Sequence, residues 1–158
     1  MAKKPAVWIA DTTDSEVLAG LLHVFNTEFH TPSPGIAVLT RRLQTLLAGT
    51  QMFAVLSGTP ANAFGLVSLR NNVWFDMPVA LLDELYVDPQ LRGSGIGTLV
   101  MHAVEQECRS RSIALLEVNV DEADVDARRF YEQHGFATTD PDTGVRSFYL
   151  SRYLDTNQ

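Results

Sequence analysis

The sequence predicts an α/β protein in which strands and helices alternate along one continuous chain. Apolar residues recur at helical spacing in four stretches, and short apolar runs typical of strands lie between them. Breaks rich in Gly, Pro and Asn separate these stretches, with no linker or internal repeat. The predicted order is β-α-α-β-β-β-α-β-α-β-β, and 158 residues suit one domain spanning residues 1–158.

The first third of the chain predicts one strand and two helices. Residues Ala6–Asp11 form an apolar strand, and Thr13 with Glu16 has the spacing of a capping box that begins a helix. The segment 31–35, Thr-Pro-Ser-Pro-Gly, ends that helix. Apolar residues at helical spacing then predict a second helix over Ile36–Leu47.

The rest of the chain predicts six strands and two helices. Residues 57–62, Ser-Gly-Thr-Pro-Ala-Asn, join two strands as a hairpin, and residues 71–78 form a polar loop that carries Trp74 and Phe75. The strands are Met52–Leu56, Ala63–Arg70, Val79–Val87, Ala114–Val120, Phe136–Thr139 and Ser147–Leu150, and the helices are Thr98–Arg111 and Asp124–His134.

Composition narrows the class of protein. Hydrophobic residues at 46% and charged residues at 20% are ordinary for a soluble globular protein. No apolar run approaches the ~20 residues that cross a bilayer, and no charged-then-apolar leader opens the chain, so we expect a cytoplasmic protein with no membrane partner. The net charge of −7 argues against nucleic acid as a partner. The single cysteine, Cys108, lies in a helical stretch and is expected to be a structural thiol rather than a reactive one.

A Gly-rich turn follows the strand that ends at Val87. Arg92 precedes three glycines at alternate positions, 93, 95 and 97, and an apolar-periodic helix begins at once. Exposed amides at a helix N-terminus attract phosphate, which predicts a pyrophosphate cradle. A Walker loop is excluded because no Lys is present. The dinucleotide fingerprint has different glycine spacing, although Glu117 lies at the distance of a ribose-binding acid. An ordinary Gly-rich turn is the other alternative.

Two motifs resemble the GNAT N-acetyltransferase superfamily. Val87-Asp88-Pro89, followed by Arg92-x-x-Gly95-x-Gly97 and Leu99, is similar to its acetyl-coenzyme A signature. Downstream, Ala127-x-x-x-Tyr131-x-x-x-Gly135-Phe136 is similar to its A-x-x-x-Y-x-x-x-G-F segment. The resemblance covers residues 50 to 150 best. It implies a mixed, mostly antiparallel central sheet flanked by helices, and acetyl-CoA as co-substrate.

The resemblance also implies which residues bind acetyl-CoA. In this family the strand before the cradle splays from its neighbour and pairs with the pantetheine arm, and the amide of Val87 is expected to receive the thioester oxygen. Asp124 stands where the family often has Asn, and ionised Asp accepts hydrogen bonds without donating them. The residues assigned to the cofactor are Leu85, Tyr86, Val87, Arg92, Gly93, Ser94, Gly95, Ile96, Gly97, Thr98, Asp124, Ala127 and Tyr131.

Two side chains are candidates for proton transfer. Tyr131 matches the family's tyrosine near the thioester sulfur and can protonate a departing thiolate; the alternative is an aromatic that only packs. Glu84 is the candidate base for the amine, directly or through water. Strand alternation predicts Glu84 and Tyr86 on one face and Asp83 on the other. A solvated strand end is the alternative explanation for these two acids.

The acceptor site is the least defined part of the prediction. Acids and aromatics would suit a cationic amine through charge and cation–π contact. Phe25 and Phe29 also have the spacing of core residues, and residues 25–29, Phe-Asn-Thr-Glu-Phe, faintly resemble aminoglycoside N-acetyltransferases. The candidate acceptor residues are Glu28, Phe29, His30, Trp74 and Glu84.

These observations favour an acetyl-CoA-dependent N-acetyltransferase acting on a small-molecule or peptide amine. No metal is required for direct attack of an amine on a thioester. The alternatives are a non-catalytic acyl-CoA-binding sensor and a dinucleotide-binding oxidoreductase domain. The sequence leaves the acceptor amine, the acyl-chain preference and a monomer or homodimer state open.

Overall fold

The computed structural model describes residues 6–154, which fall into two compact units divided between Val118 and Asn119. The first unit contains a five-stranded sheet and three helices. Its strands are β1 Val7–Ile9, β2 Met52–Gly58, β3 Ala61–Arg70, β4 Val79–Val87 and β5 Leu116–Val118. Its helices are α1 Ser15–Glu28, α2 Ile36–Ala48 and α3 Ile96–Ser110, with 3-10 turns at Thr12–Asp14 and Pro89–Leu91. The second unit contains α4, Val125–Gln133.

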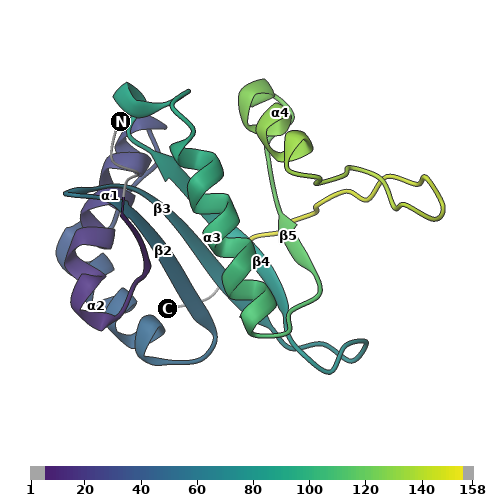
Figure 1. The fold of residues 1–158 in the computed structure, drawn as a ribbon, viewed down its shortest axis with the longest axis horizontal. Coiled ribbons are helices and arrows are strands. Elements are labelled where there is room, and N and C mark those ends of the chain that lie inside the picture. The colour runs from purple at the N-terminus through teal and green to yellow at the C-terminus, as the bar shows by residue number, and fades with distance from the viewer. Residues whose placement is uncertain (1–5, 155–158) are drawn as a thin grey trace. The chain divides into compact units, whose positions relative to one another are not determined.

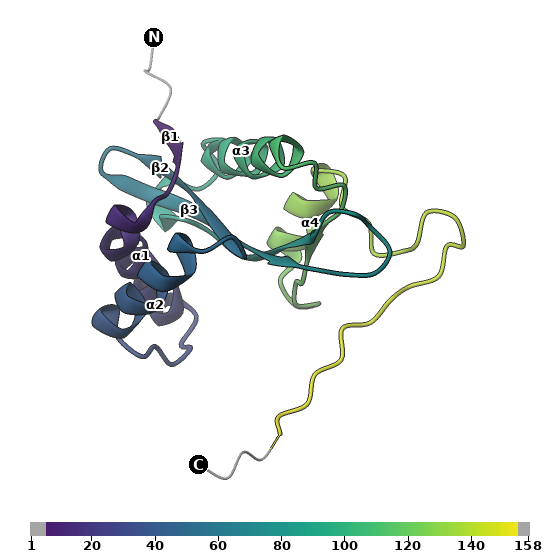
Figure 2. The same ribbon diagram turned by 90° about the horizontal axis from the view of Figure 1, so that it is seen from below.

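The sheet is mixed and mostly antiparallel, as predicted. Its order is β1-β2-β3-β4-β5, with antiparallel pairing between the first four strands and parallel pairing between β4 and β5. The parallel pair requires a crossover, and α3 supplies it. In Figure 1 and Figure 2, α1 and α2 lie on one face of this sheet and α3 lies on the other. The order of elements through α4 agrees with the order predicted from the sequence.

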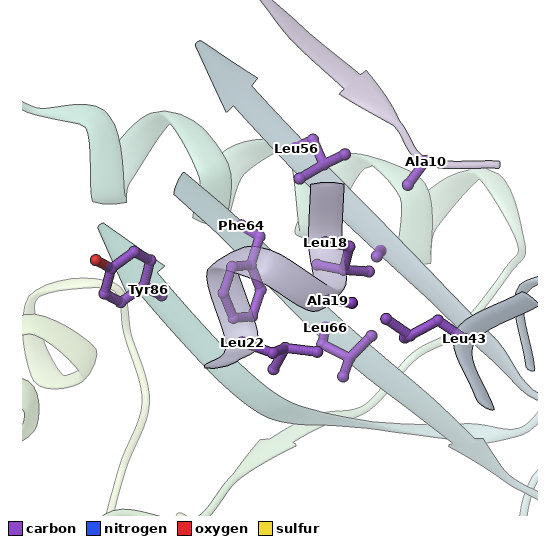
Figure 3. Packing of buried hydrophobic residues seen from close by; sticks show 10 residues of the cluster. Ala10, Leu18, Ala19, Leu22, Leu43, Leu56, Phe64, Leu66 and Tyr86 are labelled. Atoms are coloured by element: carbon purple, nitrogen blue, oxygen red, sulfur yellow. The ribbon is translucent and has the colours of Figure 1, made fainter. Parts of the chain in front are cut away.

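The main apolar cluster lies between the sheet and the α1–α2 pair. Figure 3 shows Leu18 and Leu22 of α1 against Phe64 of β3, with Tyr86 of β4 at the margin of the group and its hydroxyl directed away from the other labelled side chains. Leu18 and Phe64 are fully buried. On the opposite face, Gly65 leaves room for α3 to approach the sheet. Because a Cβ at Gly65 would lie 3.0 Å from Val104 and 3.2 Å from Val100, a side chain at that position would push α3 away.

A β-bulge interrupts β4 and changes which side chains share a face. Leu66 pairs with Glu84 while the next residue, Val67, pairs with Leu82, so Asp83 is the extra residue. The prediction that Asp83 faces opposite to Glu84 assumed strict alternation, and a bulge breaks alternation by placing two residues opposite one. Leu66 lies in the apolar cluster under α1 and α2, and Glu84 is paired with it, so Glu84 is on the same face. Alternation along β3 places Ser68 on that face too. Because Asp83 interacts with Ser68, both acids lie on the α1–α2 face.

The N-terminal cap differs from the predicted one. Asp11, rather than Thr13, is the capping residue: its Oδ1 accepts from the amide of Thr13 at 2.7 Å. The reciprocal bond comes from Asp14, which accepts from the amide of Asp11 at 3.1 Å. A carboxylate accepts hydrogen bonds more strongly than a hydroxyl, and this box closes a 3-10 turn before α1 begins. The predicted box of Thr13 and Glu16 is therefore wrong.

The second unit lacks the two closing strands predicted at 136–139 and 147–150. Within its described residues the only bridge pairs Thr139 with Arg146, around a turn in which Asp140 accepts from the amides of Asp142 and Thr143. These short segments were expected to close the sheet, but a strand requires a neighbouring backbone to pair with, and this turn brings together one pair only. Figure 2 shows the chain after α4 running without further helix or strand.

Two smaller expectations concern Cys108 and the membrane. Cys108 is buried in α3, and burial raises the pKa of its thiol to about 11, in keeping with the predicted structural thiol. None of the helices in residues 6–154 has the length and apolar character that a bilayer-crossing helix needs.

Candidate acetyl-transfer site

The C-terminal half of β4 has a strand neighbour on one edge only. β5 pairs with β4 from Ala80 to Leu82 and ends at Val118, so its pairing stops where the bulge begins. The amide of Asp88 donates to the carbonyl of Asn62 on β3, at 2.9 Å. Because successive peptide groups of a strand point to opposite edges, the amide and carbonyl of Val87 point away from β3. Within the first unit, β4 therefore presents an unpaired backbone edge over residues 84–87, which we call the open edge.

Glu84 is the most perturbed acid described in the first unit. It is partly buried, and burial, followed by the negative charge of Asp83, raises its pKa to about 7. Asp83 is the more exposed of the two, and burial raises the pKa of its carboxyl as well, with hydrogen bonding from Ser68 opposing the shift. A carboxyl group with a pKa near neutrality can accept a proton at physiological pH and release it again.

The Gly-rich turn has the backbone geometry of an anion cradle. Gly93 and Gly95 adopt left-handed conformations with φ of 74° and 86°, and Gly95 is the residue from which α3 begins. The first turn of α3 leaves its amides without intrahelical acceptors; Leu99 is the first to donate within the helix, to Gly95. A Cβ added at either glycine meets no atom within 4 Å, so the space beside these amides is open. The cradle therefore fits a phosphate group.

Arg92 joins this turn to α1 and to β4. Its two terminal nitrogens contact the carboxylate oxygens of Glu28, at 2.7 and 2.8 Å, and its Nε donates to the carbonyl of Val87 at 3.0 Å. The guanidinium also lies 5.9 Å from the ring centre of Tyr86. The resemblance implied a cofactor-binding role for this side chain, and in the structure it bridges α1 and β4.

The end of α1 brings aromatic and acidic residues to the same place. Phe25 packs against Tyr86, with ring centres 5.6 Å apart, and against Phe29, at 5.0 Å. Phe25 is thus a core contact, while Phe29 is 52% exposed. Glu28 is the last residue of α1, and His30 follows with a left-handed φ of 53° that turns the chain away. Glu28, Phe29 and His30 therefore lie beside the C-terminal end of β4.

The structure separates Trp74 from this group. Trp74 lies in the loop between β3 and β4, and this loop precedes Val79, at the opposite end of β4 from Val87. Figure 1 shows that loop and the α3 N-terminus at opposite ends of the sheet. Asn72 holds the loop by accepting from the amides of Trp74 and Phe75, both at 2.9 Å, and Trp74 is 86% exposed.

The second unit carries the downstream motif on one helix. Asp124 caps α4 by accepting from the amide of Ala127 at 3.0 Å, as its side chain predicted. Ala127 and Tyr131 are four residues apart and share a face of α4. The ring of Tyr131 packs edge-on against Phe136, at 5.6 Å, and Gly135 ends the helix in a left-handed conformation.

Two features escaped the sequence analysis. The bulge at Asp83 has no local signature, although two adjacent acids in an apolar strand were a signal that regular alternation would be costly there. The Glu28–Arg92 pair joins residues 64 positions apart, so no sequence pattern could indicate it.

Glu117, weighed as a ribose-binding acid, instead pairs with Arg70 at the surface of the sheet, at 3.1 Å. Among the described residues no cluster of three or more His, Cys, Asp or Glu side chains could hold a metal ion.

The mixed sheet, the open edge of β4 and the glycine cradle together define an acetyltransferase of the GNAT type. A family model described as "Acetyltransferase (GNAT) domain" matches residues 9–150. The chain therefore belongs to the GNAT acetyltransferase family and is an N-acetyltransferase. No curated protein sequence matches it.

Solved structures agree with this assignment. A protein from Arthrobacter sp. FB24, provisionally described as an acetyltransferase, is 44% identical, with a TM-score of 0.90 over 98% of this chain and 99% of that chain. The aminoglycoside acetyltransferase meta-AAC0020 from an uncultured soil metagenomic sample, in complex with sisomicin, is 17% identical, with a TM-score of 0.78 over 96% and 97%. A ribosomal-protein-alanine N-acetyltransferase from Brucella melitensis biovar Abortus 2308 is 19% identical, with a TM-score of 0.70 over 94% and 99%. The last two similarities concern the fold alone.

Proposed function

We propose that this enzyme transfers the acetyl group of acetyl-CoA to a primary amine of a small molecule or a peptide. The observation that carries the proposal is the position of Glu84. This half-buried carboxyl, with a pKa of about 7, stands between the bulge of β4 and the open edge at Leu85–Val87. When an amine attacks a thioester directly, the protein must supply a group that accepts the amine proton and a surface that holds the thioester. Glu84 and the free edge of β4 can supply these two.

The open edge of β4 suits the arm and the thioester of the donor. The peptide groups of Leu85 and Val87 point away from β3 and lie beyond the end of β5, so an extended amide-containing chain can pair with them as a strand would. The amide of Val87 is the proposed donor to the thioester oxygen, on which negative charge develops during attack. In the cradle, the amides of residues 93–98 would hold the pyrophosphate.

Glu84 is the proposed base. An amine attacks only after it has lost its proton, because an ammonium ion has no lone pair. With a pKa of about 7, Glu84 is ionised in about half of the molecules at neutral pH and in most of them at pH 8. The charge on Asp83 keeps the Glu84 carboxylate basic, and it also attracts a cationic acceptor. An ordered water between Glu84 and the amine is compatible with the same role.

Tyr131 is the proposed acid for the leaving thiolate. Its phenol can give a proton to the sulfur, and its place on α4 matches the tyrosine of the family motif. The step is balanced: a nitrogen–carbon bond forms as the carbon–sulfur bond breaks. The ammonium nitrogen gives one proton to Glu84 or water before attack. The thiolate takes the proton of Tyr131, and the second proton lost from nitrogen as the amide forms restores that phenol through water. The thioester supplies the electrophile, and the protein supplies alignment and proton transfer.

Acetyl-CoA consumption with a panel of amines tests the proposal. Thiol release is followed with simple primary amines, polyamines, aminoglycosides and peptide N-termini, with and without each acceptor. Release that requires an amine, with the acetylated amine identified by mass spectrometry, supports the proposed reaction. Binding of acetyl-CoA without release for any amine would favour an acyl-CoA sensor, and no binding at all would remove acetyl-CoA from the account.

A further inference from the structure

Arg92 makes contacts that leave its guanidinium committed to protein groups. Its fork meets both oxygens of Glu28, at 2.7 and 2.8 Å, and its Nε meets the carbonyl of Val87 at 3.0 Å. All three nitrogens thus have a partner within the first unit. A two-pronged arginine–carboxylate contact has a fixed geometry, unlike most surface ion pairs. The Arg92 side chain is 44% exposed and that of Glu28 is 27% exposed, so the pair is partly shielded from water.

The elements that Arg92 joins have different tasks in the proposed reaction. Val87 ends the open edge of β4, where the acetyl donor would pair, and Glu28 ends α1 next to Phe29 and His30, the candidate acceptor residues. The turn after α1 is held by local bonds: the amides of Phe29, His30 and Thr31 donate to carbonyls within the last turn of the helix. Side chains of α1 also reach the following residues, Asn26 to the carbonyl of Pro32 at 3.3 Å and His23 to the hydroxyl of Ser33 at 2.9 Å. The ion pair to Arg92 is the long-range contact that fixes the direction of Glu28.

We propose that Arg92 is a positioning residue for the amine acceptor rather than a ligand of the cofactor phosphates. It holds Glu28 and the end of α1 against the end of β4, and we call this arrangement the Arg92 clamp. Each oxygen of the clamped Glu28 carboxylate keeps a second lone pair, which can accept a hydrogen bond from the ammonium group of a substrate. The acceptor class is therefore an amine that arrives as a cation, with the Glu28 carboxylate as the group that receives its ammonium hydrogen bond. The acceptor part of this inference rests on the proposed function.

The first test uses coenzyme A and no acceptor. Arg92→Gln and Glu28→Gln each break the clamp. Arg109→Gln is the control because it removes an equal charge from an ion pair with Glu105, at 2.9 Å, that lies within α3 and joins no second element. Calorimetry gives the affinity for coenzyme A, and hydrogen–deuterium exchange follows residues 25–31. We expect both clamp variants to exchange this segment about fivefold faster or more, with coenzyme A affinity within about twofold of wild type.

The outcome would differ if Arg92 bound the cofactor phosphates. In that case Arg92→Gln would lose about tenfold or more of the affinity for coenzyme A while Glu28→Gln would keep it, and this result would overturn the proposal. Unchanged exchange of residues 25–31 in either clamp variant would also overturn it, because Arg92 would then not position α1. Both measurements remain decisive if no amine in the panel is acetylated, so a failure of the clamp is distinguishable from a failure of the proposed function.

The second test uses the most rapidly acetylated amine of the panel at saturating acetyl-CoA. We expect each single variant to raise the KM for the amine about tenfold with a smaller change in kcat. The double variant should resemble the single ones, because both residues act as one unit. Additive losses, or an effect confined to the KM for acetyl-CoA, would contradict the clamp.

Discussion

The two halves of β4 differ although they belong to one strand. From Val79 to Leu82 the strand is mostly buried and is paired with β3, and from Ala80 to Leu82 it is paired with β5 as well. From Glu84 to Val87 it is paired with β3 only, and it carries an acid with a pKa of about 7. The bulge at Asp83 separates the halves. The comparison teaches that one extra residue marks the boundary between a doubly paired stretch of strand and a stretch that presents unpaired backbone groups and a half-buried carboxyl.

The largest expected effect concerns the proton acceptor in the second half of β4. Glu84→Gln keeps the shape of the side chain and removes the base, so kcat should fall by about 10²-fold or more. The wild-type rate should rise as the pH rises through about 7, because the carboxylate is the active form, and this limb should be absent in the variant. The full rate–pH profile of both proteins is the measurement. Glu117→Gln, which alters an exposed acid on β5, is the control; superimposable profiles for Glu84→Gln would remove Glu84 from the mechanism.

A second effect tests whether chemistry depends on a group outside β4. Tyr131→Phe keeps the ring that packs against Phe136 and removes the phenol proton. Turnover should fall by about 10²-fold while the affinity for coenzyme A, measured by calorimetry, stays unchanged. Tyr149→Phe serves as control because Tyr149 is 74% exposed. Full turnover in Tyr131→Phe would leave this ring with a packing role only.

A third effect probes the cradle that follows the open half of the strand. Gly95→Val places a branched side chain in the open space beside the amides and imposes strain at a φ of 86°. Affinity for coenzyme A should fall by about ten- to a hundredfold in calorimetry. Gly144→Val carries comparable strain, at a φ of 67° in the turn of the second unit, and should leave the affinity intact. Equal losses in both variants would show that strain, not the cradle, is responsible.

A fourth effect probes the structural half of β4. Leu82 is 2% exposed and faces α3 beside Gly65, so Leu82→Ala leaves a cavity. The free energy of unfolding should fall by about 2–4 kcal/mol, seen as a lower denaturation midpoint in urea. Affinity for coenzyme A should change by less than about twofold in the folded protein. A large loss of affinity with normal stability would contradict the division of β4 into two halves.

The smallest effect concerns the stability that the folded protein loses when the half-buried Glu84 carboxyl ionises. Folding raises the pKa of Glu84 from 4.5 to about 7, so its contribution to stability is fully present below pH 4.5 and is lost as the pH rises through 7. Glu84→Gln cannot titrate and should be more stable than wild type at pH 8, by about 1–2 kcal/mol after allowance for partial exposure. The corresponding gain in Tm is roughly 2–6 °C. The gain should shrink at pH 5, and an equal gain at both pH values would assign it to another cause.

Features set by neighbouring residues are predicted from the sequence, and features set by residues far apart in the chain are not. Val79–Val87 has the predicted bounds because its apolar run is flanked by a polar loop and a Pro-containing turn, which are local signals. The cradle follows from three alternate glycines before an apolar-periodic helix. The predicted strands at 136–139 and 147–150 are absent because a strand depends on a partner backbone, which the local sequence does not report.

The sequence by itself determined the α/β order through α4, the glycine-rich turn before α3 and the candidacy of Glu84 and Tyr131, because each depends on residues near one another in the chain. The tertiary structure alone decided that Asp83 joins Glu84 on one face, since the bulge depends on how β4 registers against β3. It also decided that Arg92 meets Glu28, since an ion pair across 64 positions exists only once α1 is packed on the sheet. The tertiary structure also decided the pKa of Glu84, because burial and a neighbouring charge set it.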